Sequence, residues 1–314
     1  MKAYYSTKYG GPEYAFFGEL PDVSAKNGEV LVEVKAVSIN PVDYKIMQGA
    51  VRLISGSKFP RVFGTDFSGI VKEITEGVTG FVPGDKIYGS KSIIFEKMGA
   101  LAELLAVSPD RIRKIPEGMS FEEAASLPVA ALTALNGLRR CNVSQGSKVL
   151  VNGGTGGVGH FAIQIAKARG AHVTSTSGSS NFELAKKLGA DFVSGYTKDD
   201  LRKMAEKFDA ILDAAGLMEY SDILRLLKKG GVHASTLFFP PSSIYAPFIS
   251  IISGRKLTSA NMRARPEDYE EIEMLWKEKK LVPLIDSTFP LSKCGDAFYH
   301  TEHGKPRGKV IVTV

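Results

Sequence analysis

Residues 147–177 read SKVLVNGGTGGVGHFAIQIAKARGAHVTSTS, and this stretch decides the fold. A short apolar run at 149–151 leads into a glycine-rich turn, where Gly154, Gly156 and Gly159 have the G-x-G-x-x-G spacing. Apolar residues then recur on one helical face up to Gly170, and a second apolar run follows. This order of strand, glycine turn, helix and strand is typical of a dinucleotide site, in which a pyrophosphate binds at the helix N-terminus.

The three glycines have separate predicted roles. Gly154 is expected to allow a tight turn, Gly156 to let the backbone approach the pyrophosphate, and Gly159 to let the helix pack on the strand. We include Thr155, which lies in the same loop, in the predicted cofactor site. A glycine turn that binds no ligand is the simpler alternative.

The residues after the second strand favour NADPH over NADH. A site selective for NAD usually has an acidic residue about 20 positions after the glycines, but none occurs between Glu123 and Glu183. The strand ends instead in small polar residues, 175–181, which suit a 2′-phosphate and carry no repelling carboxylate. An ordinary polar loop is the alternative.

The same acid-free stretch carries an excess of positive charge. The net charge of the chain is +6, but elsewhere its lysines and arginines are scattered among the 34 acidic residues. We therefore expect no nucleic acid as a partner. We attribute the local excess to a phosphate-bearing cofactor. Its cations are Arg139, Arg140, Lys148, Lys167 and Arg169.

The composition is that of a globular protein of about two domains. Of the 314 residues, 44% are hydrophobic and 24% are charged. We find no apolar run of about 18 residues and no signal-like N-terminus, so we expect no membrane span and a cytoplasmic location. The only cysteines are Cys141 and Cys294. Two buried free thiols are expected, with a bridge between them as the alternative.

From residue 147 to about 260, apolar runs alternate with amphipathic segments. This alternation predicts an α/β fold with a doubly wound parallel sheet of Rossmann type. Strands are expected at 148–152, 171–176, 190–194, 208–213, 231–237 and 255–260. Helices are expected between them at 157–169, 181–188, 198–206, 218–228 and 243–252.

The first 115 residues show short strand-like runs separated by Gly, Pro and Asp turns, with no helices expected between them. This pattern predicts an antiparallel barrel or rolled sheet, with strands at 29–37, 69–74, 86–89 and 102–107. Helices are expected at 121–125, at 130–140 and from 266, and a last strand at 309–314. We expect the tail to rejoin the first domain, so that the domains are 1–122 with 262–314, and 123–261.

The sequence predicts no metal site. A zinc dehydrogenase uses Cys and His ligands, but no Cys precedes Cys141 and no His precedes His160. The nearby His300, Glu302 and His303 are better explained as the polar end of a surface helix.

Several segments together with the glycine loop resemble one family. They are GEVLVEV at 28–34, SINPVDYK at 38–45, GTDFSG at 64–69, VPGDKIYG at 82–89 and RGKV at 307–310. Over nearly its whole length the chain resembles the zinc-independent, quinone oxidoreductase-like branch of the medium-chain dehydrogenase/reductase superfamily. The N-P-x-D-x-K segment is especially similar to NADPH-dependent alkenal/enone oxidoreductases.

The resemblance implies a GroES-like, partly open barrel domain, a Rossmann domain that binds NADPH, and a homodimer. In zinc-binding relatives a Cys stands near the position of Asn40 and a His follows the equivalent of Gly64, where this chain has Thr65. Relatives often carry a Lys or Arg at the positions of Ser180 and Asn181, and this chain has neither.

The resemblance also implies a set of cofactor-binding residues. Lys45 is expected to reach the cofactor, Thr133 to lie near the nicotinamide, and Gly157 and Val158 to line the pyrophosphate. The expected surroundings of the 2′-phosphate are Gly178, Ser179, Ser180, Asn181 and Tyr196. The backbone of Leu237, Phe238 and Phe239 is expected at the nicotinamide amide, with Arg307 and Gly308 at the C-terminal side of the site.

The favoured reaction is hydride transfer from NADPH to the β-carbon of an α,β-unsaturated carbonyl, with a proton from solvent. Asn40 and Asp43, the predicted catalytic residues, would position the reactants together with Lys45. NADPH-dependent quinone reduction is the nearest alternative, and non-catalytic NADPH binding or RNA binding is an alternative of another class. The apolar stretch 238–249 either walls an apolar substrate site or forms a dimer surface.

The predicted residues also have simpler explanations. Lys45 is otherwise a solvated surface lysine, and Asn40 and Asp43 are turn formers. Thr133 otherwise bonds only its own helix backbone, and Tyr196 only packs at a strand end.

Overall fold

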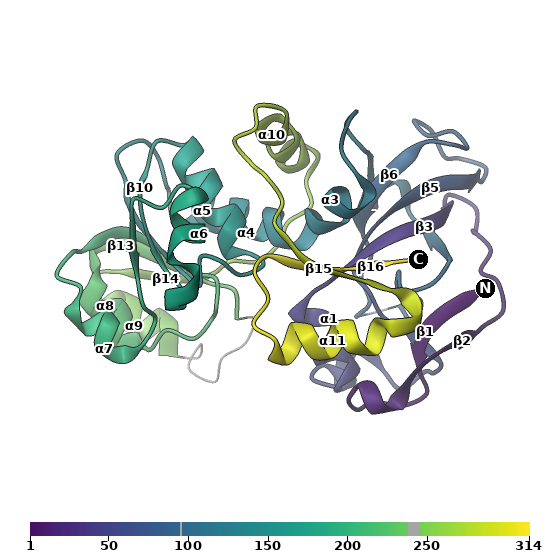
Figure 1. Cartoon of the computed structure of the whole chain (residues 1–314), viewed down its shortest axis with the longest axis horizontal. Helices are drawn as coiled ribbons and strands as arrows, with labels where there is room; N and C mark the ends of the chain where they lie inside the picture. Colours follow the sequence, from purple (N-terminus) through teal and green to yellow (C-terminus); the bar gives the residue numbers. More distant parts are fainter. Residues whose placement is uncertain (95, 238–244) are drawn as a thin grey trace. The chain divides into compact units, whose positions relative to one another are not determined.

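The computed structural model describes residues 1–94, 96–237 and 245–314 (Figure 1). The contacts divide the chain into two compact units. The first unit contains Met1–Val129 and Ile285–Val314, and the second contains Ala130–Leu284.

The second unit is built on a six-stranded parallel sheet with the order β11-β10-β9-β12-β13-β14. The chain runs outward from β9 and then returns to pair β12 on its other side, so the switch point lies between β9 and β12. Every strand predicted for this region is confirmed. The strands are β9 (Lys148–Asn152), β10 (His172–Thr176), β11 (Phe192–Ser194), β12 (Phe208–Asp213), β13 (Leu227–Ser235) and β14 (Lys256–Ser259).

Helices connect these strands, as the alternating pattern predicted. Val149, Leu150 and Val151 of β9 have no exposed surface, since a parallel sheet is covered on both faces. On one face Leu150 packs with Leu201 and Ile223 from two of the crossover helices. The helices are α4 (Pro128–Arg140), α5 (Gly159–Ala168), α6 (Phe182–Lys187), α7 (Lys198–Lys203), α8 (Tyr220–Leu226), α9 (Ala246–Ser253) and α10 (Pro266–Lys277).

The first unit contains a seven-stranded, mostly antiparallel sheet, in agreement with the predicted barrel or rolled sheet. Its order is β15-β16-β3-β5-β6-β8, with β7 also paired to β3, and only β15 and β16 run parallel. The strands are β3 (Val30–Ile39), β5 (Asp66–Ile74), β6 (Lys86–Ser90), β7 (Leu104–Val107), β8 (Ile112–Lys114), β15 (Ile285–Pro290) and β16 (Lys309–Thr313).

The C-terminal strand confirms that the tail rejoins the N-terminal part of the chain. Val310 of β16 pairs with Ile39 of β3, in an antiparallel register that continues to Thr313 and Ala36. A second, three-stranded sheet has the order β2-β1-β4 and contains β1 (Lys2–Ser6), β2 (Ala15–Glu19) and β4 (Arg61–Val62).

The expectation that no helix interrupts the first 115 residues is wrong. Two short helices, α1 (Pro41–Met47) and α2 (Arg52–Ser55), lie between β3 and β4. Seven residues are too few to show a helical period, but Asn40 and Asp43 form a capping box and Pro41 is at the first helical position. The first unit also contains α3 (Phe121–Ser126) and α11 (Cys294–His303).

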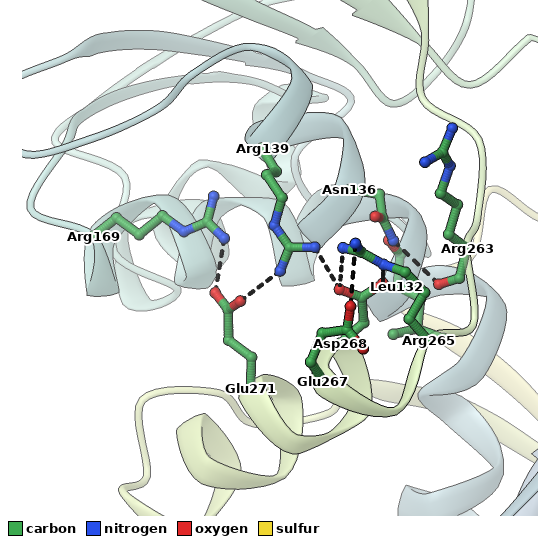
Figure 2. A network of polar contacts seen from close by, with 9 residues as sticks. All are labelled: Leu132, Asn136, Arg139, Arg169, Arg263, Arg265, Glu267, Asp268 and Glu271. Carbon is green, nitrogen blue, oxygen red and sulfur yellow. Dashed lines mark hydrogen bonds and ion pairs between the residues drawn. The ribbon is translucent and has the colours of Figure 1, made fainter.

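Helix α10 belongs to the second unit, whereas the sequence placed residues from 262 onward in the first domain. Figure 2 shows the reason. Arg139 of α4 pairs with Asp268 and Glu271 of α10, and Arg169 pairs with the same Glu271 at 2.7 Å. Asp268 is completely buried and also pairs with Arg265. The opposite charges that hold this helix lie far apart in the sequence.

Candidate cofactor site and buried charge cluster

The glycine loop follows β9 at the carboxyl end of the parallel sheet. Gly154 lies within a tight turn that the Gly156 N–H closes on the Gly153 carbonyl oxygen at 3.1 Å, and the positive φ of this turn, +79°, is at Gly153. Gly154 is also needed for packing, because a Cβ there would lie 1.9 Å from Ser175 Oγ. A Cβ on Gly159 would lie 2.1 Å from the carbonyl oxygen of Gly153. That close approach confirms the predicted packing of α5 on the strand end.

Gly156 is different from its neighbours. A Cβ there would meet only the Gly153 carbonyl oxygen, at an ordinary contact distance of 3.5 Å. The chain itself therefore does not require glycine at this position. A bare backbone is needed where a ligand approaches closely, and the loop leads directly into α5, whose first N–H groups can bind an anion. The loop thus fits a pyrophosphate.

Polar side chains hold the strand ends beneath this loop. Asn152 Nδ2 donates to Asp213 Oδ1 at 2.7 Å, and Thr176 Oγ1 donates to Asn152 Oδ1 at 2.6 Å. The N–H of Gly153 donates to Thr176 Oγ1, and that of Met218 donates to Asp213 Oδ2. We name Asn152, Thr176 and Asp213 the sheet-edge ladder. It joins three neighbouring strands to the two loops that follow β9 and β12.

One buried histidine lies next to this ladder. Burial lowers the pKa of His233 to about 4, against the opposing effect of Asp213. His233 is therefore neutral at physiological pH, and the ladder contains no cation.

The residues predicted around the 2′-phosphate follow β10 at the same end of the sheet. Ser179 and Ser180 are exposed, and a Cβ on Gly178 would lie 3.8 Å from Tyr196 Cε1. Tyr196, which follows β11, is 54% exposed, so its ring is accessible to a ligand. Asn181 Oδ1 is buried with no hydrogen-bond partner within the described ranges.

The other predicted cofactor residues of this unit are buried or partly exposed, and two of them lie outside the described residues. Thr155 is buried within the glycine loop, whereas Gly157 and Val158 are partly exposed there. Thr133 is 6% exposed in α4. Leu237 is half-buried after β13, while Phe238 and Phe239 lie outside the described residues.

The attribution of the local positive charge to a cofactor is wrong. Arg139 and Arg169 pair with α10, as Figure 2 shows. Lys148 pairs with Glu206 at 2.6 Å and Lys167 with Asp191 at 2.8 Å. Arg140 donates to Thr258 Oγ1. These cations have structural partners outside the acid-free stretch, so they give no support to a phosphate site.

The predicted catalytic residues lie in the first unit, where Asn40 precedes α1 and Asp43 is in its first turn. Asp43 is completely buried and accepts hydrogen bonds from the Asn40 N–H at 2.8 Å and from Thr65 Oγ1 at 2.7 Å. Asn40 Nδ2 donates to Asp66 Oδ2 at 2.9 Å, and Lys309 Nζ donates to Asn40 Oδ1 at 2.6 Å. Five side chains from distant segments thus form one cluster, which we name the buried charge cluster.

Burial dominates the electrostatics of this cluster. It raises the pKa of Asp43 to about 6 and that of Asp66 to about 7, although hydrogen bonds and Lys309 oppose both shifts. It also lowers the pKa of Lys309, against the effect of the two carboxylates. Two carboxylates and one ammonium leave an excess negative charge, which binding of one proton removes.

Thr65, Asp66 and Lys309 were not predicted as parts of this site. A signal was present, because Asp66 follows the apolar pair Val62 and Phe63 and Lys309 begins an apolar run. Charges in buried strands need partners. The electrostatic interaction of Lys309 with Asp66, however, spans 243 positions and depends on the register of β16 with β3.

The remaining predicted residues of the first unit are exposed or at a turn. Lys45 is exposed on α1, and Arg307 is exposed with its N–H donating to Asp286 Oδ1. Gly308 has a φ of +83°. His300 and His303 are in the last turn of α11, as expected, and His300 pairs with Asp286.

Within the described ranges, no group of three or more His, Cys, Asp or Glu residues is placed to hold a metal ion. Cys141 and Cys294 are both buried and free, which confirms the expected thiols. In the same part of the chain, no helix is long and apolar enough to cross a membrane.

Comparisons with known proteins agree with this architecture. A family model described as a zinc-binding dehydrogenase matches residues 188–312, and an alcohol dehydrogenase GroES-like domain matches residues 26–117. The chloroplast envelope quinone oxidoreductase homolog of Arabidopsis thaliana is 34% identical, over 98% of this chain and 96% of its own. The chloroplastic NADPH-dependent alkenal/one oxidoreductase of Arabidopsis thaliana is 33% identical, over 99% and 79% respectively.

A solved structure gives the same result for the whole chain. The quinone oxidoreductase from Coxiella burnetii has a TM-score of 0.92 and 32% sequence identity, with 100% of this chain and 99% of that chain covered. The sheet topology, the glycine loop and these relatives lead to one conclusion: the chain belongs to the quinone oxidoreductase-like branch of the medium-chain dehydrogenase/reductase superfamily.

Proposed function

We propose that this protein is an NADPH-dependent reductase that saturates the activated C=C bond of an α,β-unsaturated carbonyl. The observation that carries the proposal is the glycine loop. Gly156 has no side chain there, although a Cβ at this position would not clash with any other atom of the chain. The relatives named as quinone and alkenal/one oxidoreductases support the reaction class. NADPH, when bound, supplies a hydride, and the protein positions the reactants.

We propose distinct tasks for the chain's own residues. The glycine loop and the start of α5 would bind the pyrophosphate, and Tyr196 with residues 178–181 would bind the adenosine end. Asn40 and Asp43 are buried and hydrogen-bonded, so we assign them as positioning residues for the start of α1. That helix carries Lys45, which we propose to contact the cofactor. Thr133, Arg307 and Gly308 keep their predicted roles.

NADPH is preferred over NADH in this proposal because the polar turn after β10 has no acidic residue from Ser177 to Asn181. Exposed serines and backbone N–H groups remain to hold the 2′-phosphate. Titration with each cofactor tests the preference. We expect a lower Kd for NADPH, whereas tighter binding of NADH would overturn it. Lys45→Ala is expected to raise the KM for NADPH more than it lowers kcat.

The proposed chemistry is zinc-independent. The positions held by metal ligands in zinc-binding relatives are taken by Asn40 and Thr65, and both side chains are committed to hydrogen bonds within the buried charge cluster. Elemental analysis of the purified protein is expected to show no stoichiometric zinc. About one tightly bound zinc ion per chain would contradict this proposal.

Quinone reduction is the second candidate, because two of the relatives described above are named for it. Both reactions need an apolar site next to the cofactor rather than a particular ligand set. A panel of 2-alkenals, enones and quinones, followed by NADPH absorbance and product analysis, separates them. We expect saturated carbonyl products. Oxidation of NADPH by quinones alone would favour the second candidate, and tight binding without turnover would favour a non-catalytic protein.

The cytoplasmic location and the homodimer remain proposals. The first rests on two buried cysteines that form no disulfide. Exposed apolar residues of α9, such as Phe248 and Ile251, fit either a dimer surface or a substrate wall.

A further inference from the structure

His160 lies in the first turn of α5, directly after the glycine loop, and has no exposed surface. Its ring Nδ1 is 3.0 Å from the carbonyl oxygen of Gly156, and its backbone N–H donates to the same oxygen at 3.1 Å. The N–H of Leu284 is 3.2 Å from the other ring nitrogen, Nε2. One buried side chain thus joins the glycine loop to the last residue of the second unit.

These contacts fix which ring nitrogen carries the hydrogen. A backbone N–H can only donate, so Nε2 of His160 accepts the hydrogen bond from Leu284. An imidazole that accepts at one nitrogen carries its single hydrogen on the other, which is Nδ1. This N–H then donates to the Gly156 carbonyl oxygen, which can only accept. His160 therefore holds that carbonyl with two donors, one from its backbone and one from its ring.

The carbonyl that His160 holds belongs to the peptide between Gly156 and Gly157. Glycine adopts most backbone angles at low cost, so a peptide flanked by two glycines turns over more easily than others. The C=O and N–H of a trans peptide point in opposite directions, so a carbonyl held toward α5 leaves the Gly157 N–H directed away from the helix. A peptide turned the other way would present a carbonyl oxygen there, and an oxygen repels a phosphate.

Two N–H groups at this end of α5 are available to a ligand. Within the described residues, no group of the chain accepts a hydrogen bond from the N–H of Gly157 or of Val158, and both residues are partly exposed. Such N–H groups, which precede the first helical hydrogen bonds, are the donors that bind an anion at a helix N-terminus. The orientation of the peptide between Gly156 and Gly157 therefore decides whether one of these two donors can act.

We propose that His160 is a positioning residue for the pyrophosphate of NADPH. It keeps the Gly156 carbonyl turned into α5, and so keeps the Gly157 N–H free to bind a phosphate oxygen. His160 is itself completely buried, so it acts through Gly156 and not by touching the cofactor. This inference rests on the proposed binding of NADPH at the glycine loop and adds to it the residue that fixes the shape of the loop.

The test separates the two ring contacts of His160. His160→Asn keeps an amide donor near the position of Nδ1, His160→Gln keeps only an acceptor near the position of Nε2, and His160→Leu removes both. Gln164→Leu is the matched control on the same helix. Gln164 is 8% exposed and bonds the backbone of Val282 twice, at 3.0 and 2.8 Å. Its hydrogen bonds within the described residues do not reach residues 153–159.

Two ligands are titrated into each variant: NADPH and adenosine 2′-phosphate, which has no pyrophosphate. His160→Leu and His160→Gln are expected to raise the Kd for NADPH about tenfold, the effect of one hydrogen bond to a charged group, and to leave the Kd for adenosine 2′-phosphate unchanged. His160→Asn should bind both ligands as the wild type does. Gln164→Leu should also bind both normally, although its thermal unfolding temperature falls. Equal weakening of both ligands in His160→Leu would overturn the inference.

A second measurement needs no ligand. Nitrogen-15 NMR of the imidazole in the cofactor-free protein should show a hydrogen on Nδ1 of His160 and none on Nε2, and a hydrogen on Nε2 would overturn the inference. The two levels of the account fail differently. If the wild type does not bind NADPH, the proposed function fails and this inference fails with it. If the wild type binds NADPH and His160→Leu binds it equally well, the inference fails alone.

Discussion

The two buried polar clusters of this protein differ in how their charges and hydrogen bonds are balanced. The sheet-edge ladder of Asn152, Thr176 and Asp213 binds backbone N–H groups with neutral partners and one carboxylate, so each group has a fixed hydrogen bond. The buried charge cluster places three ionisable side chains together without enough opposite charge. The first arrangement holds a loop in one shape. The second leaves one negative charge without a balancing cation, and burial raises the pKa of both of its carboxyl groups.

The largest expected effect comes from removing the only cation of the buried charge cluster. Lys309→Met should lower the free energy of unfolding by about 3–5 kcal/mol, because it leaves buried carboxylates uncompensated. Urea denaturation at neutral pH measures it. Adding Asp66→Asn to this variant removes one carboxylate and should recover much of the loss. A loss below about 1 kcal/mol in Lys309→Met would show that the cluster is already neutral without the lysine.

The glycine loop gives the next largest effect and separates packing from ligand binding. Gly159→Ala should cost about 1–3 kcal/mol, since its Cβ would meet the Gly153 carbonyl oxygen at 2.1 Å. Gly156→Ala should leave the unfolding free energy within about 0.5 kcal/mol and weaken NADPH binding at least about tenfold. Thermal unfolding and NADPH titration of both variants check this. Equal stability losses at the two positions would contradict the distinction.

The pH dependence of stability follows from the raised pKa values in the charge cluster. Both carboxyls bind protons more tightly in the folded protein than the ordinary value of 3.8 allows. Their contribution to stability is therefore full below about pH 4 and is lost as pH rises through about 6 to 7. Denaturation at several pH values should show a smaller decline in Asp66→Asn. An identical slope in the variant would remove Asp66 as its source.

The smallest expected effect concerns the ion pairs of α10. Arg169→Gln breaks one partly exposed pair with Glu271 and should cost about 1 kcal/mol or less. Because this arginine has a structural partner, the Kd for NADPH should not change. A clear rise in that Kd without a change in stability would instead show that Arg169 contributes to cofactor binding.

The same contrast explains what the sequence could predict. The second unit follows from local patterns, since strand, glycine turn and helix are contiguous and the glycines at 154, 156 and 159 show their spacing directly. The hydrogen bond of Lys309 to Asn40, and its electrostatic interaction with the two acids, depend on long-range register, which no local pattern contains. Helix α1 was missed because seven residues show no period. Packing also decides that Gly153, rather than Gly154, takes the positive φ.

The most direct test of the central claim follows the hydride itself. NADPH carrying deuterium at its transferable position is incubated with the protein and a 2-alkenal, and the product is analysed by NMR. We predict a saturated aldehyde with deuterium on the β-carbon. Deuterium on the carbonyl carbon of an allylic alcohol, or no transfer from NADPH to any alkenal or enone, would contradict the account.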